Sequence, residues 1–347
     1  MESIDKIMRA AVSDGVFPGA VLLVSQRNKS LFHKAFGYAN IYQQRPVTTQ
    51  TLFDLASLTK PLATTLAVIK LIAASTLRLQ ETLGKLLPEL KASPMSHITV
   101  AHLLRHQSGL PDYRPFYQSL QHMPLAERKD ALNRLLCETP LIYPIGEKTI
   151  YSDLGFMMLR WLVERLANRR LDHFVREEIY KPLGLENLFF VDSNMPVMEK
   201  VFAATEACAW RNGLVEGSVH DENAFVVGGV DGHAGLFGTA EDVHALLCEI
   251  QSLYHGADSR GVLKKEIVQE FLNFGKKTAR ALGFDRPASK NSSSGSHFSK
   301  NSVGHLGFTG VSFWMDLDRS LLIILLTNRI HPTRENEKIK IFRPVLH

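Results

Sequence analysis

FDLASLTKP, residues 53–61, is the most informative stretch of this sequence. Pro61 has no amide hydrogen, which a helix tolerates comfortably only in its first turn, so we expect a helix to begin at Ser57 or Leu58. There, free backbone amides and the positive end of the helix dipole favour a negative charge on Ser57. Lys60 lies on the same helical face, within reach of the Ser57 hydroxyl. Because a partly buried lysine can lose its proton at neutral pH, this pair is a candidate nucleophile and base.

A serine and a lysine at this spacing also occur together by chance, and Ser57 could simply cap the helix while Lys60 extends to water. Two further segments strengthen the catalytic interpretation. Tyr151-Ser152-Asp153 precedes a predicted helix that we expect Asp153 to cap, although Tyr151 could be only a packed aromatic. Gly304-His305-Leu306-Gly307-Phe308-Thr309-Gly310 lies in a predicted strand, where glycines mark a bulge or the close approach of a group such as a substrate.

The order of the predicted elements indicates an α+β fold. An amphipathic helix opens the chain, and a β-hairpin follows with its turn at Gln26–Lys29. The helix after Pro61 is apolar on most sides and should be buried. The pattern from residue 77 to residue 280 is mainly helical. A second hairpin, with its turn at Asp316–Arg319 and a second arm too apolar to face water, comes near the end of the chain.

These elements predict an antiparallel sheet that is built from both chain ends and flanked by helices. Residues 1–76 and 281–347 would form the sheet lobe, and residues 77–280 a large all-helical insertion. The active-site cleft is expected between the two lobes. Residues 285–303 contain seven serines and no apolar periodicity, which predicts either a mobile loop beside the cleft or a disordered linker.

Composition excludes several classes of protein. Of the 347 residues, 45% are hydrophobic and 22% charged, which is typical of a globular chain and not of a disordered one. The longest apolar run, Leu321–Leu326, is far too short to cross a bilayer, and the N-terminus has no apolar signal region, so we expect a cytoplasmic protein without a membrane span. The net charge of +5 comes from basic and acidic residues that are interspersed, which argues against nucleic-acid binding.

The sequence predicts neither a cofactor nor a metal. His102 and His106 have the spacing of two ligands on a helix, but the glutamate of an HExxH site and a third ligand are missing. Three cysteines, Cys137, Cys208 and Cys248, lie far apart and are expected to be reduced, mostly buried thiols.

Taken together, the three catalytic segments make the chain resemble the serine β-lactamase and penicillin-binding-protein superfamily, in its class C-like branch with esterases and D-amino-acid peptidases. That family carries SxxK, Tyr-x-Asn, and Lys-Thr-Gly or its variant His-x-Gly, in this order. Here they stand as Ser57–Lys60, Tyr151–Asp153 and His305–Gly307. LLRHQSGLP at 103–111 and GGVDGHAGLFGTAED at 228–242 also resemble family signatures, so the resemblance covers nearly the whole chain.

The resemblance implies a role for each motif residue. Ser57 would attack an acyl carbon and form an acyl-enzyme, and Lys60 and Tyr151 would share the proton transfers, with the pKa of Tyr151 lowered by the lysine. The backbone amides of Ser57 and Phe308 would form the oxyanion hole. The residues expected to bind the substrate are Asp153, His305, Gly307 and Gln107.

Three departures from the family pattern qualify these roles. Asp153 replaces the usual asparagine, and its carboxylate should hold Lys60 protonated. His305 replaces a lysine and should be mostly neutral, so it would grip a substrate carboxylate less firmly. Efficient hydrolysis of β-lactams is therefore not expected. Relatives usually continue into a last helix that packs on the sheet, and we expect this chain, which stops at His347, to lack it.

The leading hypothesis is a serine hydrolase that cleaves a small amide or ester through an acyl-enzyme on Ser57. D-amino-acid peptides, peptides derived from the cell wall and β-lactams are the candidate substrates. One alternative is a promiscuous carboxylesterase, and another is a penicillin-binding or sensor module that acylates without turnover. The expected partner is a small molecule or short peptide, and the sequence gives no oligomeric state.

Overall fold

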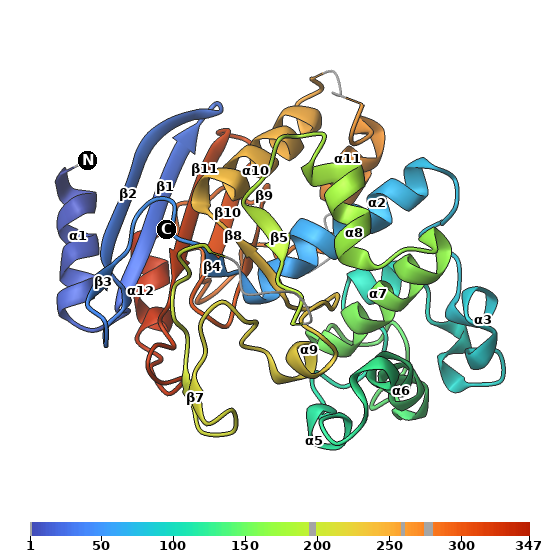
Figure 1. Ribbon diagram of the computed structural model, residues 1–347. Coiled ribbons are helices and arrows are strands. Elements are labelled where there is room, and N and C mark those ends of the chain that lie inside the picture. The colour runs from blue at the N-terminus through green and yellow to red at the C-terminus, as the bar shows by residue number, and fades with distance from the viewer. Residues whose placement is uncertain (1, 194–198, 258–260, 274–279) are drawn as a thin grey trace.

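The computed structural model describes residues 2–193, 199–257, 261–273 and 280–347. Its largest sheet has six antiparallel strands in the order β3-β2-β1-β11-β10-β9, so strands from both ends of the chain lie side by side, as the sequence predicts (Figure 1). These strands are β1 (Gly19–Gln26), β2 (Lys29–Asn40), β3 (Arg45–Pro46), β9 (Ser302–Leu306), β10 (Ser312–Asp316) and β11 (Leu321–Thr327).

The first hairpin turns where the sequence predicts it. β1 and β2 are joined by Arg27 and Asn28, whose φ angles are 51° and 62°. Two left-handed residues in a two-residue loop are typical of a type I′ turn, whose twist matches that of the flanking strands. On its other side β1 pairs with β11, with Ala20 opposite Thr327.

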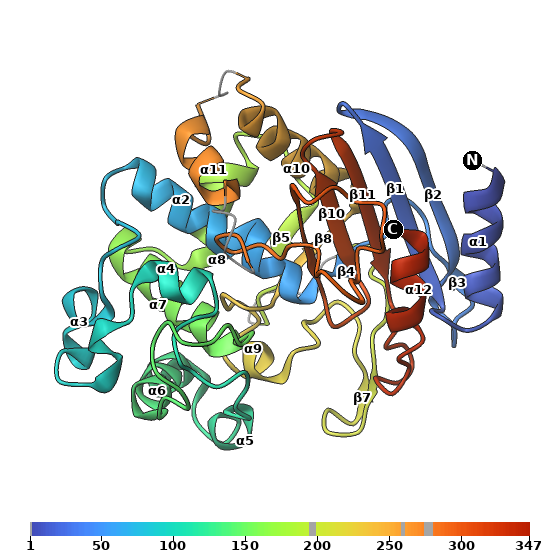
Figure 2. The ribbon, with the colours of Figure 1, turned by 180° about the vertical axis from the view of Figure 1, so that it is seen from behind.

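β11 is apolar along its whole length because both of its faces are buried. Leu322, Ile324 and Leu326 belong to the main hydrophobic core, while the residues between them belong to a second core on the opposite side of the sheet. Residues of β1 and β2 also belong to that second core, and two helices from the chain ends cover it, α1 (Glu2–Ser13) and α12 (Ile339–Leu346). Seen from behind, α12 lies against the sheet beside the central strands (Figure 2).

The expectation that the chain lacks the last helix is wrong, because α12 is that helix. Ile339 is buried in the second core, and Phe342 and Leu346 pack against it. Pro344 lies inside the helix, which on local grounds argues against helical structure. The apolar stripe at this spacing packs on the sheet, and such packing supplies most of the stability of a short helix.

The predicted second hairpin is a three-stranded meander. The segment expected to be one long arm is divided into β9 and β10 by a turn in which the Gly307 amide donates to the Val311 carbonyl. Gly310 in this turn has a φ of 103°, and a Cβ there would lie 2.0 Å from Thr327 Oγ1. The turn therefore requires glycine at this position.

Helices form the larger part of the molecule. The run that starts at residue 56 consists of the 3₁₀ turn η1 (Ala56–Leu58), the π-helical turn η2 (Lys60–Thr64) and α2 (Thr65–Ala73), so the helix begins where Pro61 predicts it. The other helices and 3₁₀ or π turns are α3 (Leu83–Leu86), η3 (Pro88–Leu90), η4 (Pro94–His97), α4 (Val100–Leu104), α5 (Tyr117–Leu120), α6 (Leu125–Glu138), α7 (Asp153–Ala167), α8 (Leu171–Val175), η5 (Arg176–Tyr180), α9 (Glu222–Val226), α10 (Ala240–Tyr254) and α11 (Lys265–Leu272).

The α+β fold class is confirmed, and the structure adds short strands to the segment that was expected to be all helical. They are β5 (Leu188–Phe190), β6 (Ala207–Cys208), β7 (Gly213–Leu214) and β8 (Leu236–Gly238). β8 lies between β5 and β4 (Phe53–Asp54) in a three-stranded sheet. In this sheet β4, just before Ser57, pairs with β8, which lies in the GGVDGHAGLFGTAED segment. The pairing holds these two segments next to each other.

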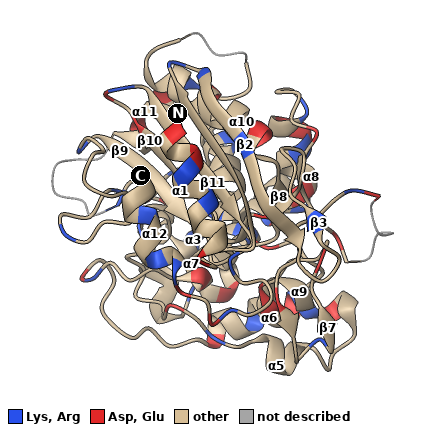
Figure 3. Ribbon diagram, turned by 90° about the vertical axis from the view of Figure 1, so that its left-hand side faces the viewer, with Lys and Arg blue, Asp and Glu red and all other residues tan. Residues whose placement is uncertain are grey.

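One helical stretch, Ala56–Ala73, is long and apolar enough to cross a membrane by length and composition, but 78% of it is buried inside the protein. This burial identifies the stretch as the core helix of a folded domain. On the side that shows α1 and α12, basic residues lie among acidic ones and form no single stripe (Figure 3).

The serine-rich segment at 285–303 forms no helix or strand before β9 begins at Ser302. It is anchored at several points: the Asp285 amide donates to the Gly304 carbonyl, Ser294 is fully buried, and His347 Nδ1 lies 2.9 Å from the Ser293 carbonyl oxygen. Asp285 also lines the cavity described below, so the segment starts at the cleft, as predicted.

Candidate active site

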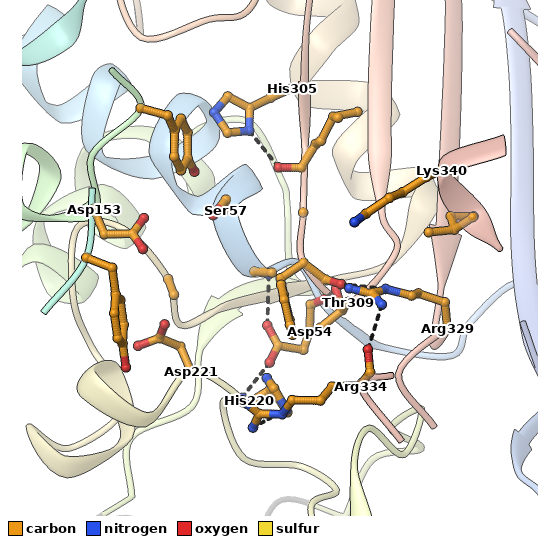
Figure 4. Close-up of a pocket in the computed structure, with 18 of the residues that line it drawn as sticks. Asp54, Ser57, Asp153, His220, Asp221, His305, Thr309, Arg329, Arg334 and Lys340 are labelled. Carbon is orange, nitrogen blue, oxygen red and sulfur yellow. Dashed lines mark hydrogen bonds between the residues drawn. The ribbon is translucent and has the colours of Figure 1, made fainter. Parts of the chain in front are cut away.

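A cavity of about 730 Å³ opens where the sheet, the helical part and the C-terminal segment meet (Figure 4). Six of the residues that the sequence predicts for the site line it, namely Ser57, Tyr151, Asp153, His305, Gly307 and Phe308. Lys60, which is fully buried, and Gln107 are the two predicted residues that do not line it.

Ser57 follows a strained turn that holds it at the start of the helical run. Ala56 before it has a φ of 46°, in the left-handed region that costs a residue with a Cβ roughly 1–2 kcal/mol. Two neighbours fix this conformation: Asp54 Oδ1 accepts from the Ala56 amide at 2.8 Å, and Thr59 Oγ1 donates to the Ala56 carbonyl at 2.6 Å. Strain of this kind is typical of functional sites, because the surrounding structure must maintain it.

Lys60 Nζ makes two hydrogen bonds and one ion pair. It donates to Ser57 Oγ at 2.9 Å and to the His233 carbonyl at 3.0 Å, and it lies 2.7 Å from Asp153 Oδ1. Burial alone would lower the pKa of Lys60, but the charge of Asp153 and the proximity of Tyr151 outweigh burial and raise it. The lysine is therefore protonated at neutral pH, as the aspartate in the second motif predicts.

Tyr151 is packed between the lysine and two histidines. Lys60 Nζ lies 4.8 Å from the centre of its ring, and the rings of His106 and His305 lie at 4.7 and 5.9 Å. Burial raises the pKa of Tyr151 to about 12, even though the Lys60 charge acts in the opposite direction. The expectation of a lowered phenol pKa is thus wrong, because the lysine does not compensate for the loss of water.

Asp153 does not cap α7, contrary to expectation. Ser152 is the N-cap, and its Oγ accepts from the Gly155 amide at 3.4 Å and donates to the Pro111 carbonyl at 2.6 Å. Asp153 is the first residue inside the helix, and its partly exposed carboxylate turns to Lys60 and the cavity. The capping role and the electrostatic role therefore belong to two adjacent residues.

His305 is neutral, as predicted, and the structure gives the reason. It is buried on β9, and burial lowers its pKa to about 4. Nδ1 lies 2.8 Å from the Leu306 carbonyl oxygen, so in the neutral ring Nδ1 carries the proton and donates. Nε2, which has no partner in the described part of the chain, is then an acceptor. A neutral acceptor cannot attract a substrate carboxylate.

Gly307 permits a close approach between β9 and the strained turn. A Cβ at this position would lie 2.4 Å from Val311 Cγ2 and 3.0 Å from the Leu55 carbonyl oxygen. Any larger residue would displace the turn that carries Phe308. Gln107, in contrast, is not among the lining residues; its side-chain amide donates to Thr149 Oγ1 at 3.1 Å and supports the loop before Tyr151.

Two histidines that sequence reasoning did not assign to the site are integral to it. His106, considered above only as a metal ligand, is buried in a left-handed conformation with a φ of 57°. Its Nδ1 accepts from the Ser152 amide at 3.0 Å, and its ring packs on Tyr151. The signal for it was present in the segment 103–111, which resembles a family signature.

His233 contributes through both its backbone and its side chain. Its carbonyl accepts from Lys60, while its Nε2 lies 2.9 Å from Asp221 Oδ1 and its Nδ1 lies 3.6 Å from Asp231 Oδ1. Burial would lower the pKa of His233, but the two aspartates outweigh it and raise this pKa to about 10. The buried Arg160, 3.6 Å from Asp231, completes the network.

The cavity has charges of opposite sign at its two sides. Asp153 and Asp221 lie on one side, and Arg329 and Lys340 lie on the other, with Ser57 between them (Figure 4). No group of three or more His, Cys, Asp or Glu side chains within the described residues is arranged to hold a metal ion. The lining includes a serine, a tyrosine and hydrogen-bond donors, the types of group that acyl transfer requires.

Comparison with known proteins places these motifs in a family. The model of the family described as Beta-lactamase matches residues 4–343. An N-acetylmuramyl-L-alanine amidase of Bacillus subtilis (strain 168) is 34% identical over 95% of this chain and 81% of its own length. A protein of Escherichia coli (strain K12), provisionally named D-alanyl-D-alanine carboxypeptidase, is 32% identical over 93% of this chain and 81% of its own length.

Solved structures share the fold. EstCE1, described as a hydrolase with promiscuous acyltransferase activity, superposes with a TM-score of 0.76 at 21% identity, covering 99% of this chain and 98% of that one. An octameric penicillin-binding protein homologue from Pyrococcus abyssi superposes with a TM-score of 0.75 at 19% identity, covering 99% of this chain and 77% of that one.

Proposed function

The chain belongs to the beta-lactamase family, a hydrolase family by the names of its relatives, and on this basis we propose that it cleaves small amides or esters through an acyl-enzyme on Ser57. The observation that carries the proposal is the 2.9 Å contact between Lys60 Nζ and Ser57 Oγ at the floor of the cavity. A pure binding domain has no need of a serine held by a strained turn against a buried lysine.

In the proposed reaction, the Lys60–Tyr151 pair first loses one proton to solvent, after which Ser57 Oγ attacks the acyl carbon and passes its proton to the pair. The backbone amides of Ser57 and Phe308 would hold the oxyanion, and removal of one such donor costs about 3 kcal/mol in related acyl-transfer sites. The leaving amine or alkoxide takes a proton from Tyr151 as its bond to the acyl carbon breaks. Water then gives a proton to the same pair as it attacks the ester, and the pair returns a proton to Ser57 Oγ as the acid is released.

We propose an amide of a peptide derived from the cell wall as the substrate. The two relatives named above are an amidase of N-acetylmuramyl-L-alanine and a carboxypeptidase of D-alanyl-D-alanine by name, and both kinds of bond are amides in such peptides. A cavity of about 730 Å³ lies within the range of sites that enclose molecules of this size. Because Lys60 is held protonated and His305 is neutral, we expect β-lactams to be poor substrates.

Carboxylesterase activity is the second candidate, and the protonation of Lys60 favours it. An activated ester has a good leaving group and needs less help from a base than an amide does. Both activities would use the same acyl-enzyme, so the two candidates differ in substrate and share the role of Ser57.

Intact-mass measurement after incubation with a fluorophosphonate tests the proposal. Ser57 Oγ should displace fluoride and add one phosphonyl group per chain, whereas Ser57→Ala should remain unmodified. Ser119→Ala, a serine on α5 outside the cavity, is the control and should react like the wild type. Labelling of Ser57→Ala, or no labelling of the wild type, would contradict the assignment. Turnover of p-nitrophenyl esters, D-amino-acid anilides, muropeptides and nitrocefin would then separate hydrolysis from acylation without turnover.

A further inference from the structure

Asp54 is a buried carboxylate to which the proposed reaction assigns no role. It is the last residue of β4, and it is only 2% exposed. Its carboxylate forms no ion pair with a described residue, and the nearby His220 ring lies 3.0 Å from Glu206 Oε2 instead. Burial raises the pKa of Asp54, although its hydrogen bonds act in the opposite direction. A charge buried without a cation destabilises the folded state, which indicates a role other than stability.

Both oxygens of this carboxylate accept from backbone amides, in two separate segments. Oδ1 accepts from the Ala56 amide at 2.8 Å, in the strained turn before Ser57. Oδ2 accepts from the His220 amide at 2.7 Å, in the loop before α9. Figure 4 shows the Asp54 carboxylate between Ser57 and His220. An asparagine has one acceptor oxygen and cannot serve both amides.

The backbone of Asp54 makes a third connection, to the turn that carries Phe308. Its carbonyl accepts from Thr309 Oγ1 at 2.8 Å, and Thr309 is itself buried. Ser57 and Phe308 are the residues whose amides are proposed to hold the oxyanion. Ala56 comes directly before Ser57, and Thr309 comes directly after Phe308. Asp54 thus bonds to the direct neighbour of each proposed donor.

The orientation of the Ser57 amide depends on the backbone of Ala56. This amide belongs to the peptide bond that follows Ala56, whose φ of 46° is unfavourable for a residue with a Cβ. Without an acceptor for its own amide, Ala56 should relax towards the right-handed region and turn that peptide bond. Oxyanion donors act over distances of about 2.7–3.1 Å, so a displacement of about 1 Å removes most of their effect.

We propose that Asp54 is a positioning residue for the oxyanion hole. Through Ala56 it sets the direction of the Ser57 amide. Through Thr309 it holds the turn that carries the Phe308 amide. The inference rests on the proposed function, because it concerns the same acyl transfer to Ser57. Since the oxyanion forms only in the transition state, the effect should fall on the rate of acylation and not on binding of the substrate.

The test is acylation of Asp54→Asn by a p-nitrophenyl ester, with the enzyme in excess. Fluorophosphonate labelling carried to completion counts the competent sites, and the dependence of p-nitrophenolate release on enzyme concentration separates the acylation rate constant from the dissociation constant of the ester. Asp54→Asn should keep the dissociation constant and lower the rate constant about a hundredfold. Its affinity for phenylboronic acid, which bonds to Ser57 Oγ and mimics the tetrahedral intermediate, should fall by about the same factor.

Asp316→Asn is the matched control. Asp316, the last residue of β10, is also fully buried, and it does not line the cavity. Its carboxylate also accepts from backbone amides, those of Ser299 at 2.9 Å and Asp318 at 3.0 Å. Asp316→Asn should therefore lower the free energy of unfolding, while its acylation rate constant and its affinity for phenylboronic acid stay as in the wild type.

Thr309 supplies a second pair of variants, which decides if Asp54→Asn does not fold. Thr309→Val removes the hydrogen bond to the Asp54 carbonyl at nearly constant volume and should slow acylation about tenfold. Thr309→Ser keeps the hydroxyl and should restore the rate constant to within about twofold of the wild type.

A wild-type acylation rate constant in Asp54→Asn, or in Thr309→Val where Asp54→Asn does not fold, would overturn the assignment. So would an equal loss in Asp316→Asn, or a loss confined to the dissociation constant of the ester. In each of these cases, acylation that depends on Ser57 would show that the proposed function survives. A wild type that released no p-nitrophenolate in a Ser57-dependent reaction would instead count against the function itself.

Discussion

Replacing Asp153 with asparagine tests the proton chemistry of the site most directly. The substitution removes one negative charge 2.7 Å from Lys60 Nζ and keeps an acceptor oxygen of the same size at the same place. Because Ser152 and not Asp153 caps α7, the helix start is retained. The expected result is a shift of the acid limb of the pH–rate profile to lower pH.

The size of the shift follows from the contact. Two unit charges 2.7 Å apart interact by roughly 6 kcal/mol at an effective dielectric constant of about 20, which is an upper bound for a carboxylate that is partly exposed. Opposite charges at such distances shift pKa values by about 1–3 units in proteins. The pKa of Lys60 is raised in the wild-type protein. The hydrolytic activity of the wild type should therefore increase with pH through the alkaline range. Asp153→Asn should move the midpoint of the acid limb down by about 1–3 pH units. At a pH below the wild-type midpoint, kcat/KM should rise about tenfold for each unit of this shift.

The assay is kcat/KM for a neutral p-nitrophenyl ester between pH 6 and pH 10, with single-turnover acylation as a check on the rate-limiting step. Asp112→Asn is the control, since the Asp112 carbonyl accepts from the Asp153 amide at 2.9 Å but the Asp112 carboxylate contacts the Tyr113 amide and not Lys60. An acid limb that stays in place in Asp153→Asn would refute the argument that Asp153 holds the proton on Lys60. A uniform loss of activity at every pH would assign the carboxylate to positioning.

Three further outcomes follow from the same geometry. Ser57→Ala should abolish turnover and change the free energy of unfolding, measured in urea, by no more than about 0.5 kcal/mol, because the hydroxyl is proposed to serve chemistry and not packing; a large loss of stability would mean that it has a structural role. Lys60→Ala and Tyr151→Phe should each slow acylation by orders of magnitude, and the double variant should lose little more than the worse single one; additive losses would count against a shared proton path. His233 has a pKa raised to about 10 from an ordinary value of 6.5, so its ion pairs stabilise the fold fully below pH 6.5 and lose that effect as pH rises toward 10. The free energy by which wild type exceeds His233→Gln should therefore be larger at pH 6 than at pH 9.5, and a constant difference would argue that the imidazole is neutral.

Local sequence predicts the parts of the site that depend on local structure. Pro61 sets the helix start, and the helix start sets the position of Ser57 relative to Lys60. The strained φ of Ala56 has no such signal, because it depends on Asp54 and on a threonine inside the next turn. The same holds for α12, which forms around Pro344 because the second core receives its apolar stripe.

Proton states were harder to predict than positions. The lysine charge was expected to lower the pKa of Tyr151, yet burial has the larger effect and the pKa is raised. Burial of a side chain depends on everything packed around it, here on His106 and His305, which lie far apart in the sequence. The network of His233 with Asp221, Asp231 and Arg160 was missed for the same reason, since nothing in the sequence indicates that a residue of α7 meets a loop about 70 residues later.

In the proposed reaction, the raised pKa values of Lys60 and Tyr151 together determine which group would take the proton of Ser57. At rest Lys60 is an ammonium and Tyr151 a phenol, so the pair must lose one proton before it can accept one. Loss from Tyr151 leaves a phenolate beside an ammonium, and loss from Lys60 leaves two neutral groups; the observed pKa belongs to the pair and not to either residue. The charge of Asp153 stabilises the ammonium in the first of these forms and has no ammonium to stabilise in the second. In the proposed reaction, therefore, the aspartate in the Tyr-x-Asp motif would favour phenolate Tyr151 as the base, and Asp153→Asn would transfer that role to neutral Lys60.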